Sequence, residues 1–558
     1  MTVDEGPRGW EHGATMRPLH IIITLTLVVY ASVAGLGFVS DDHGLITHPA
    51  TGIAQQSLGQ IFSSDLWHFQ ESQSGYYRPF MMLSLKLDNL IFGEWAGGYH
   101  LHSLAWHLGC IWLIGTLFGR LMGQDRGVLA AGIYAFHPLI TEQVAFISAR
   151  NDSMATALAL AALWQVGSRH ATKRQCVTAT LLACAACLSK ETGIVVLGLL
   201  PLLDWARRRD AVGVHRYAAI VTGITTAFFV REMLGPGLLH TPPMGGADLV
   251  ASERLSLLSH LMGKLVWPWP LTDSTHLAYL GTLNPAPMCV ALALLFALAL
   301  LGGRWARAGV VFALMSLVPG MLAVASRFLV AERYLGLAVL GLAVAIAAAA
   351  PRSKRLPWAL ILALPWAWTV HQRISDWTTD LSLAQAAHRD APTPYTAAWL
   401  GHELGRADQA QAALEHLEQA TAGTPPTCDF ASEWIRLARG VEGPEAGLAA
   451  ANKIWDRGCA GGPGVRGEWA LTHLEGGDVD AARKILTPRP TTCSPSLAVP
   501  VVVISLLDGG LEQAKHCART AKVPQQHLKP EVDRLLSALT QEAVPEDTAD
   551  APPASPLP

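Results

Sequence analysis

Long runs of apolar residues, separated by short polar stretches, fill the first two thirds of the chain. The first run, residues 19–39, contains no Lys, Arg, Asp or Glu. It has about the 20 residues that a helix needs to cross a lipid bilayer. We therefore expect a membrane-spanning helix at this run and at those that follow. The further runs cover residues 101–119, 127–143, 153–167, 176–188, 192–203, 217–230, 284–302, 306–323, 334–350 and 356–371.

Beyond Asp376 no such run returns, and the chain becomes polar and rich in alanine. The last residues, from Pro545 onward, are rich in Pro and Ala and have no core-forming pattern, which predicts disorder. The chain thus divides into four predicted parts. These are a cytoplasmic N-terminus (1–18), a transmembrane module (19–375), a soluble domain on the non-cytoplasmic side (376–540) and a disordered tail (541–558).

The composition agrees with this division. Of the 558 residues, 51% are hydrophobic and 15% are charged, whereas about a quarter of a typical soluble protein is charged. A simple water-soluble enzyme is therefore excluded. The net charge of −3 gives no basic field for nucleic acid. An alternative for the first run is a signal peptide, because Ala31 to Ala34 resemble a cleavage site of small residues.

Basic residues follow every second run, which is typical of loops on the cytoplasmic side. The segment 176–203 lies between two basic loops and so crosses the membrane an even number of times. Two short helices with Lys190 at their outer apex satisfy this parity and give eleven spans, with the N-terminus inside and the C-terminus outside. The apolar stretch Leu255–Trp269 carries His260 and Lys264, and a crossing there would break the parity.

With this topology, acidic and basic residues converge on the outer membrane face. An ionisable residue at bilayer depth costs about 2.5–3.5 kcal/mol, so such a residue points to function by default. Each one also has a structural explanation. Asp152 could cap a helix, and Glu332 in the first turn of a helix could interact favourably with the helix dipole. The converging residues are Asp41, Asp42, Arg78, His137, Glu142, Arg150, Asp152, Lys190, Glu191, Asp273, Arg327, Glu332 and Arg333.

Carboxylates facing water can deprotonate a hydroxyl, and they can hold a divalent cation together with phosphate oxygens. Fixed Arg and Lys at the membrane boundary suit an anionic lipid head group and a departing phosphate. This combination favours transfer from a lipid-linked phosphate donor to a hydroxyl. No Gly-rich phosphate loop follows a strand, and the spacing of His100, His102 and His107 does not match a zinc site.

Six segments carry a family resemblance, in the family's order and spacing. FVSDDHGLI (38–46) resembles the first outer loop of the C-type glycosyltransferases. The other segments resemble the transmembrane and tetratricopeptide-repeat O-mannosyltransferases. They are YYRPFMMLSLKLDNLIFG (76–93) with GYHLHSLAWH (98–107), AFHPLITEQVAFISARND (135–152), LSKETGI (188–194), WPWPLTD (267–273) and AERYLGL (331–337).

The resemblance implies a C-type fold and a donor that is a polyprenyl-phosphate sugar, with mannose one candidate, used with inversion on the non-cytoplasmic side. It implies Asp41 or Asp42 as the general base. It assigns the donor phosphate to Arg78, Lys190 and Arg333. Supporting roles fall to His137, Glu142, Arg150, Asp152, Glu191 and Glu332, and a divalent cation, if one is needed, to Asp41, Asp42 and Glu142.

Two positions depart from the family pattern. Ser103 stands where Asn is expected, and Arg150-Asn151-Asp152 replaces a Gly-Arg-acid sequence. These departures leave the donor sugar and the acceptor open, and both a protein Ser/Thr and a glycolipid remain candidates. Two other functions are also open. One is a catalytically inactive membrane scaffold for protein–protein interaction, and the other is a transporter, whose ionisable residues would lie at the midplane.

The soluble part shows a repeat. Trp399, Trp434, Trp469 and Ile504 are spaced by one constant interval, and small residues follow each of them. This resembles the tetratricopeptide pattern of helix pairs, which stack into a solenoid able to hold a polypeptide. A generic helical bundle is the alternative. Four cysteines, Cys428, Cys459, Cys493 and Cys517, would lie in an oxidising compartment, and their three possible pairings are equivalent in sequence.

We therefore expect an all-α protein in which a polytopic bundle is followed by a tetratricopeptide-like solenoid. The membrane would be a bacterial inner membrane, with the active site and C-terminal domain in the periplasm. The expected partners are the bilayer, the lipid-linked sugar, and a polypeptide or glycolipid acceptor.

Overall fold

The computed structural model divides into two compact units, Met1–Ala391 and Pro392–Pro558. Each unit is described by itself. The residues described are 17–67, 75–167, 171–207, 213–235, 251–271, 275–276, 284–321, 329–351, 355–423, 427–428, 430–459, 462–488, 493–521 and 523–541. The predicted cytoplasmic N-terminus lies almost wholly outside this set, and so does the tail beyond Gln541.

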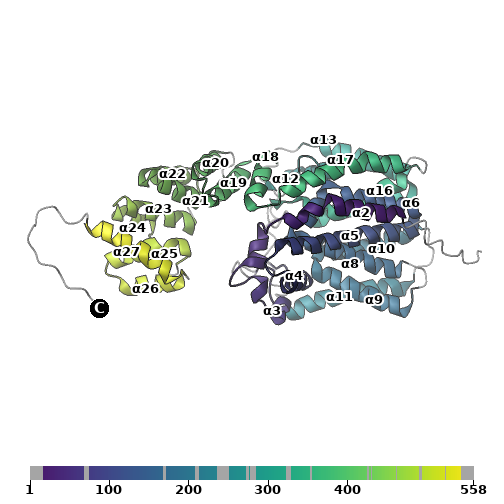
Figure 1. The fold of residues 1–558 in the computed structure, drawn as a ribbon, viewed down its shortest axis with the longest axis horizontal. Coiled ribbons are helices and arrows are strands. Elements are labelled where there is room, and N and C mark those ends of the chain that lie inside the picture. The colour runs from purple at the N-terminus through teal and green to yellow at the C-terminus, as the bar shows by residue number, and fades with distance from the viewer. Residues whose placement is uncertain are drawn as a thin grey trace, which may run out of the picture. The chain divides into compact units, whose positions relative to one another are not determined.

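The first unit is a bundle of helices, most of which lie side by side with roughly parallel axes (Figure 1). Every one of the eleven apolar runs contains a helix. In chain order these are α2 (Arg17–Val29), α5 (Ala96–Met122), α6 (Gln124–Phe136), α8 (Arg150–Val166), α9 (Lys173–Ser189), α10 (Val195–Ala206), α11 (Val214–Leu234), α13 (Ala286–Leu301), α14 (Gly303–Met315), α16 (Gly336–Ala349) and α17 (Arg355–Ser375).

Four segments are long and apolar enough to cross a membrane, judged by length and composition. They are Pro18–Gly35, Ala96–Met122, Val214–Leu234 and Glu332–Ala349. Large apolar side chains such as Val28 and Phe229 remain exposed on these helices, as expected for surfaces that face lipid. The chain is thus an integral membrane protein, and the count of eleven spans stays a prediction.

Small residues allow the bundle helices to approach closely. A methyl group added at Gly127 of α6 would come 2.4 Å from the carbonyl oxygen of Gly115 in α5. Gly309 of α14 and Gly341 of α16 are equally crowded by each other's helix backbone. Glycine and alanine at helix interfaces are typical of membrane bundles, where dispersion contacts replace the hydrophobic effect between helices.

Shorter elements cluster at one end of this bundle. Helices α3 (Leu58–Ser63) and α4 (Pro79–Phe92) lie there, as Figure 1 shows. The stretch around Lys264 forms a separate helix, α12 (Ala251–Val266). Three short helical turns connect α6 to α8: η5 (Pro138–Ile140), α7 (Thr141–Ala145) and η6 (Ile147–Ala149). Similar short turns occur elsewhere in this unit: η1 (Ala31–Gly35), η2 (His43–Thr47), η3 (Ile53–Gln55), η7 (Glu191–Ile194) and η10 (Glu332–Leu335). One two-stranded antiparallel pair joins β1 (Thr275–His276) to β2 (Leu329–Val330).

The first unit ends later than the sequence suggests. The predicted soluble domain begins at residue 376, whereas the two compact units divide after Ala391. The reason is helix α18 (Asp380–Asp390), whose first residue accepts a hydrogen bond from the backbone N–H of Ser40 at 2.7 Å and lies 2.8 Å from His43 Nε2.

The second unit consists of helix pairs. Trp399, Trp434, Trp469 and Ile504 lie in the first helix of four successive pairs. The constant spacing of these residues in sequence therefore matches the repeat of helix pairs in the structure. Whether these pairs form a tetratricopeptide solenoid stays a prediction. The pairs are α19 (Pro394–Arg406) with α20 (Ala410–Ala422), α21 (Ala431–Glu442) with α22 (Pro444–Asp456), α23 (Pro463–Glu475) with α24 (Val479–Ile485), and α25 (Pro495–Leu507) with α26 (Leu511–Thr520), followed by α27 (Gln525–Gln541).

Two disulfides stabilise this unit. One joins Cys428 to Cys459, and the other joins Cys493 to Cys517. Of the three pairings left open by the sequence, the structure thus has the one that joins the first of these four cysteines to the second and the third to the fourth.

Candidate active site

The acidic loop after η1 places its two carboxylates in different environments. Asp42 is fully buried, and its Oδ1 accepts hydrogen bonds from the backbone N–H and the hydroxyl of Ser148, at 2.9 and 2.5 Å. Asp41 is half-buried. Ser40, just before them, adopts a positive φ of 52°, which turns the chain sharply into the acidic pair. Asp42 therefore fixes the loop, and Asp41 is the more accessible of the two.

Burial raises the pKa of Asp42 from its ordinary value of 3.8 to about 7. The hydrogen bonds from Ser148 and Val39 oppose this shift, while the negative charge of Asp41 adds to it. A carboxyl group that is shielded from water holds its proton more tightly, because burial disfavours its charged form.

The second carboxylate of the site is Glu142, in α7. It is buried and accepts hydrogen bonds from both the backbone N–H of Arg333, at 2.8 Å, and the Arg333 guanidinium. The guanidinium is 24% exposed and lies over the rings of Tyr334 and Phe146, at 5.3 and 5.6 Å. Asp41 lies close enough to interact electrostatically with Arg333. The first acidic loop and η10 therefore meet, although about 290 residues separate them in sequence.

A second ion pair joins Lys190 to Asp152. The Lys190 ammonium lies 2.5 and 2.6 Å from the two carboxylate oxygens, and both side chains are largely buried. Lys190 follows α9 in an extended conformation, which directs it toward the start of α8. Burial lowers the pKa of Lys190, and the positive charges of Arg78 and Arg333 lower it further, against the attraction of Asp152.

A third ion pair joins Arg78 to Glu191. Both Nε and Nη2 of Arg78 donate to Glu191 Oε2, at 3.2 and 3.0 Å, and the guanidinium lies 4.7 Å from the ring of Tyr76. Pro79 at the first position of α4 leaves Arg78 just outside the helix. Although burial alone would raise it, the pKa of Glu191 is lowered by the charge and hydrogen bonds of Arg78.

These three pairs and Asp41 form one cluster, which we call the outer-loop cluster: Asp41, Arg78, Glu142, Asp152, Lys190, Glu191 and Arg333. Lys190 interacts electrostatically with both Arg78 and Arg333, and its ammonium lies 6.0 Å from the ring of Tyr334. Tyr334 in turn interacts with both guanidinium groups. Three cations are thus held beside aromatic rings, each neutralised by one carboxylate.

Glu332 is directed elsewhere. Its carboxylate lies 3.4 Å from the ammonium of Lys264, and both side chains are less than a tenth exposed. Lys264 also donates to the carbonyl oxygen of Pro270. Sequence reasoning noticed Lys264 only as a charge that weakened an apolar stretch. The signal that could have revealed this pair is a single lysine within an amphipathic helix, because a buried lysine needs an acidic partner.

Arg150 is placed differently from the other predicted residues. Its guanidinium is fully buried and donates to Asp88 at 2.5 Å, to Ser103 at 3.0 Å and to the carbonyl oxygen of Tyr99 at 2.7 Å. It therefore ties α8 to α4 and α5. Ser103 and Arg150 are also the two positions that depart from the family pattern, and here they are in direct contact.

His137 also packs in the interior. It is fully buried, its Nδ1 accepts from the backbone N–H of Leu139 at 3.3 Å, and its ring lies 4.7 Å from that of Trp366. His137 lies between the end of α6 and the start of η5, where it stabilises the turn between them. Asp273 and Arg327, the remaining charged residues of the predicted outer face, lie outside the described residues.

Possible metal ligands do not gather in the part of the chain that the structure describes. No group of three or more His, Cys, Asp or Glu side chains there is arranged to hold a metal ion. Glu142 is engaged by Arg333 and Asp42 by Ser148, so these two do not join Asp41 in a three-carboxylate site.

Comparison with curated proteins confirms the predicted resemblance. Protein O-mannosyl-transferase Tmtc1 of Drosophila melanogaster is 32% identical over 187 residues, which cover 32% of this chain and 22% of that protein. Tmtc2 of the same organism is 33% identical over 198 residues, 33% of this chain and 21% of that protein. F38B6.6 of Caenorhabditis elegans, also a protein O-mannosyl-transferase by name, is 26% identical over 41% of this chain and 34% of its own length. The chain thus matches only about a fifth to a third of the length of these relatives.

No family model matches the chain. Among solved structures, that of ArnT from Cupriavidus metallidurans bound to undecaprenyl phosphate covers 95% of this chain and 90% of its own, with 15% identity. The TM-score is 0.34, which is too low to establish a common fold.

Proposed function

We propose that this protein is a membrane glycosyltransferase that moves a sugar from a polyprenyl phosphate to a hydroxyl acceptor. The observation that carries the proposal is the electrostatic interaction of Asp41 with Arg333, which in turn interacts with Lys190 in the outer-loop cluster. A half-buried carboxylate beside fixed cations supplies the two things that such a transfer needs. These are a proton acceptor for the nucleophile and positive charge for the leaving phosphate. The similarity to protein O-mannosyl-transferases supports mannose and a protein hydroxyl.

The reaction is a single displacement. The acceptor oxygen attacks the anomeric carbon, the bond from that carbon to the phosphate oxygen breaks, and the acceptor proton passes to a carboxylate. The configuration at the anomeric carbon inverts, by analogy with inverting glycoside chemistry. The lipid phosphate leaves with an added negative charge, so its departure is easier where cations are already fixed.

Asp41 is the proton acceptor in this scheme, and Asp42 is a positioning residue. Asp42 is fully buried and is occupied by the hydroxyl and backbone N–H of Ser148, so an acceptor hydroxyl cannot reach it. Asp41, on the half-exposed side of the same loop, can be reached. The loop therefore uses one aspartate to hold the other in place.

Arg333 and Arg78 bind the donor phosphate. Their side chains are 24% and 13% exposed, whereas that of Lys190 is 8% exposed. Lys190 therefore stabilises the phosphate through its positive charge at a distance more than through direct contact. Glu142 and Glu191 hold the guanidinium groups in place before the donor arrives. An arriving phosphate shares these guanidinium groups with the carboxylates, since each guanidinium has five N–H donors.

The test is transfer of labelled mannose from a synthetic polyprenyl phosphate by the purified full-length chain. Asp41→Asn should reduce transfer by about 10²–10⁴-fold, the usual contribution of a general base. Asp42→Asn should reduce it by less than about tenfold, since the amide still accepts from Ser148. Asp125→Asn, an exposed aspartate at the start of α6, is the control and should not change it.

Full transfer by the Asp41→Asn variant would overturn the assignment of the base. Transfer by none of the preparations, with any lipid-linked sugar and with peptide or glycolipid acceptors, would favour the inactive scaffold. The product's anomeric configuration, measured by NMR, checks the single displacement, since retention would require a covalent intermediate.

A further inference from the structure

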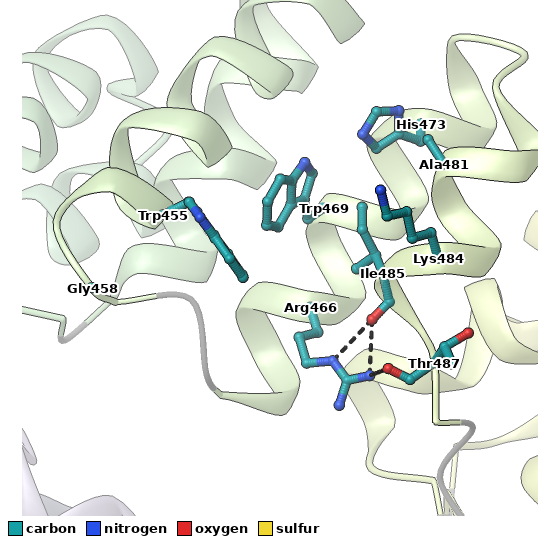
Figure 2. A pocket seen from close by; sticks show the side chains of 9 residues that line it. All are labelled: Trp455, Gly458, Arg466, Trp469, His473, Ala481, Lys484, Ile485 and Thr487. Carbon is teal, nitrogen blue, oxygen red and sulfur yellow. Dashed lines mark hydrogen bonds between the residues drawn. The ribbon is translucent and has the colours of Figure 1, made fainter.

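A groove lies on the second unit, lined by α22, α23, α24 and the residues after α24. Its volume is about 780 Å³, and nothing in the reaction proposed above uses it. Trp455 and Trp469 form one wall, with ring centroids 5.3 Å apart and planes inclined by 57°. In Figure 2 the indole of Trp469 lies between that of Trp455 and the side chain of Lys484, and the guanidinium of Arg466 is turned toward Ile485 and Thr487.

The groove exists because α24 is short. It has 7 residues, whereas the second helices of the other pairs have 13, 13 and 10. Pro488 follows shortly after and prevents the helix from continuing. Trp455 consequently remains 58% exposed. An exposed tryptophan beside a concave surface is a typical recognition feature.

The groove is positively charged. Among the described residues, Arg466 donates to neutral carbonyl oxygens, those of Ile485 at 2.8 and 3.1 Å and of Thr487 at 3.4 Å, and none of these bonds cancels its charge. Lys484 is exposed, and its ammonium extends toward Trp469 in Figure 2. Among the described residues that line the groove there is no carboxylate. Asp478, which is not among the lining residues, lies 3.7 Å from His473.

This combination of tilted indoles and cations fits an acidic segment that contains proline. Proline-rich segments in the polyproline II conformation bind to aromatic-lined grooves, because they are already extended and lose little entropy. Carboxylates on the same segment would pair with Lys484 and Arg466. A neutral sugar would also stack on an indole, but it would gain nothing from the two cations.

The chain itself contains such a segment. Residues 542–558 read EAVPEDTADAPPASPLP, with four carboxylate side chains, five prolines and no Lys or Arg. We propose that the groove binds this segment of the same chain, which we call the acidic tail.

The acidic tail can reach the groove. It follows α27, and Arg534 of α27 forms an ion pair at 2.6 Å with Glu475 at the end of α23. Glu475 is two residues from His473, which lines the groove. From Arg534 to Gln541 the helix rises by only about 10 Å. Seventeen residues can reach up to roughly 55 Å when extended, which is well beyond that rise.

Tethering makes even a weak contact persistent. A short flexible connection gives an effective concentration on the order of 1 mM, so a segment with a Kd of about 100 µM would occupy the groove about nine tenths of the time. Any other acidic segment has to displace the tail before it can bind.

The test measures binding of a fluorescent synthetic peptide of sequence 542–558 to two purified proteins, the full chain and a chain ending at Gln541. The shortened chain should bind the peptide at least five times more tightly, because in the full chain the tail competes. Binding should weaken as salt is added. A peptide with Asn and Gln in place of its acids should bind at least fivefold more weakly, and so should one with Ala in place of its prolines.

Groove variants of the shortened chain locate the site. Trp455→Ala should weaken binding about tenfold and Lys484→Glu about fivefold. Leu511→Ala and Lys529→Glu alter an exposed leucine and an exposed lysine outside the groove and should leave binding unchanged. Because Lys484 is a surface residue, its variant tests the proposal even if the tryptophan variant unfolds.

Two outcomes would overturn the proposal. Equal peptide binding by the full and shortened chains would mean that the tail does not occupy the groove and that an acidic segment from another molecule is its ligand. Undiminished binding by both Trp455→Ala and Lys484→Glu would place the peptide site elsewhere.

Discussion

Two ion pairs in the first unit join the same chemical groups and yet differ in their access to solvent. Arg150 and Asp88 are 0% and 1% exposed, and further donors of this guanidinium are directed to Ser84, Ser103 and Tyr99. Arg333 is 24% exposed over a buried Glu142. A closed pair has no donor left for a ligand, so its task is to hold helices together. An open pair keeps one face of its cation available, so it can serve a substrate.

This difference explains why charge alone did not identify the site in the sequence. Arg150 and Arg333 were both predicted to lie on one face, and the structure separates their roles through neighbours that are distant along the chain. Asp88 is 62 residues from Arg150, and Glu142 is 191 residues from Arg333. The comparison leads to four predictions, from the largest expected effect to the smallest.

Removing the cation of the closed pair should damage stability. Arg150→Met leaves the buried Asp88 with His102, 2.5 Å away, in place of its guanidinium, and breaking a buried ion pair typically costs 3–5 kcal/mol. We expect a large drop in the thermal midpoint in detergent, measured by intrinsic fluorescence. The double variant Arg150→Met with Asp88→Leu should recover most of the loss, since it removes both charges. Wild-type stability of the single variant would show that water reaches the pair.

Asp42 is a closed carboxylate whose pKa is raised by burial, so its contribution to stability should depend on pH. Its folded pKa of about 7 exceeds the ordinary 3.8, so the folded state binds the proton more tightly. Its stabilisation is complete below about pH 4 and is lost as the pH rises through 7, a change of roughly 4 kcal/mol.

Asp42→Asn should remove this dependence. The measurement is the thermal midpoint at pH 5 and pH 8, with Asp125→Asn as the control. An unchanged slope in the Asp42 variant would contradict the shifted pKa.

Removing the cation of the open pair should damage transfer. Arg333→Gln should reduce sugar transfer about 10²–10³-fold, the loss typical for one fixed donor to a developing charge. The thermal midpoint should fall much less than in Arg150→Met. The control is Arg304→Gln, which alters an arginine bonded to the carbonyl oxygen of Trp205. If Arg333→Gln unfolds the protein as Arg150→Met does, the distinction between open and closed pairs fails.

The Lys190–Asp152 pair lies between the two extremes, at 8% and 10% exposure. Lys190→Met should therefore reduce transfer only about tenfold, through loss of positive field rather than of a direct contact. A kinetic analysis should show the loss mainly in kcat, because the charge acts on the departing phosphate. A rise in KM alone would instead indicate that Lys190 binds the donor before reaction.

The helices were the most predictable part of the molecule. Each of the eleven apolar runs contains a helix, because the hydropathy of about 20 successive residues is a strong local signal. The similarity to O-mannosyltransferases was also visible in short motifs. The repeat of helix pairs in the second unit was visible in the constant spacing of Trp399, Trp434, Trp469 and Ile504.

The parts that escaped prediction depend on tertiary contacts. The burial of Asp42 arises from Ser148, which is 106 residues away. The partner of Glu332 is Lys264, in a helix whose apolar pattern was too weak to interpret. The disulfide pairing is one of three that are equivalent in sequence, and only the packing of helices distinguishes them.

The contact between the acidic loop and α18 has a consequence for biosynthesis. The backbone N–H of Gly37 donates to Thr378 at 3.2 Å, and that of Ser40 donates to Asp380, 340 residues further along. At about 5–20 residues per second, the ribosome needs roughly half a minute to supply that anchor after the loop has emerged. Nascent chains and prematurely terminated products therefore lack these two hydrogen bonds, so the acidic loop reaches its final form only after α18 has been translated.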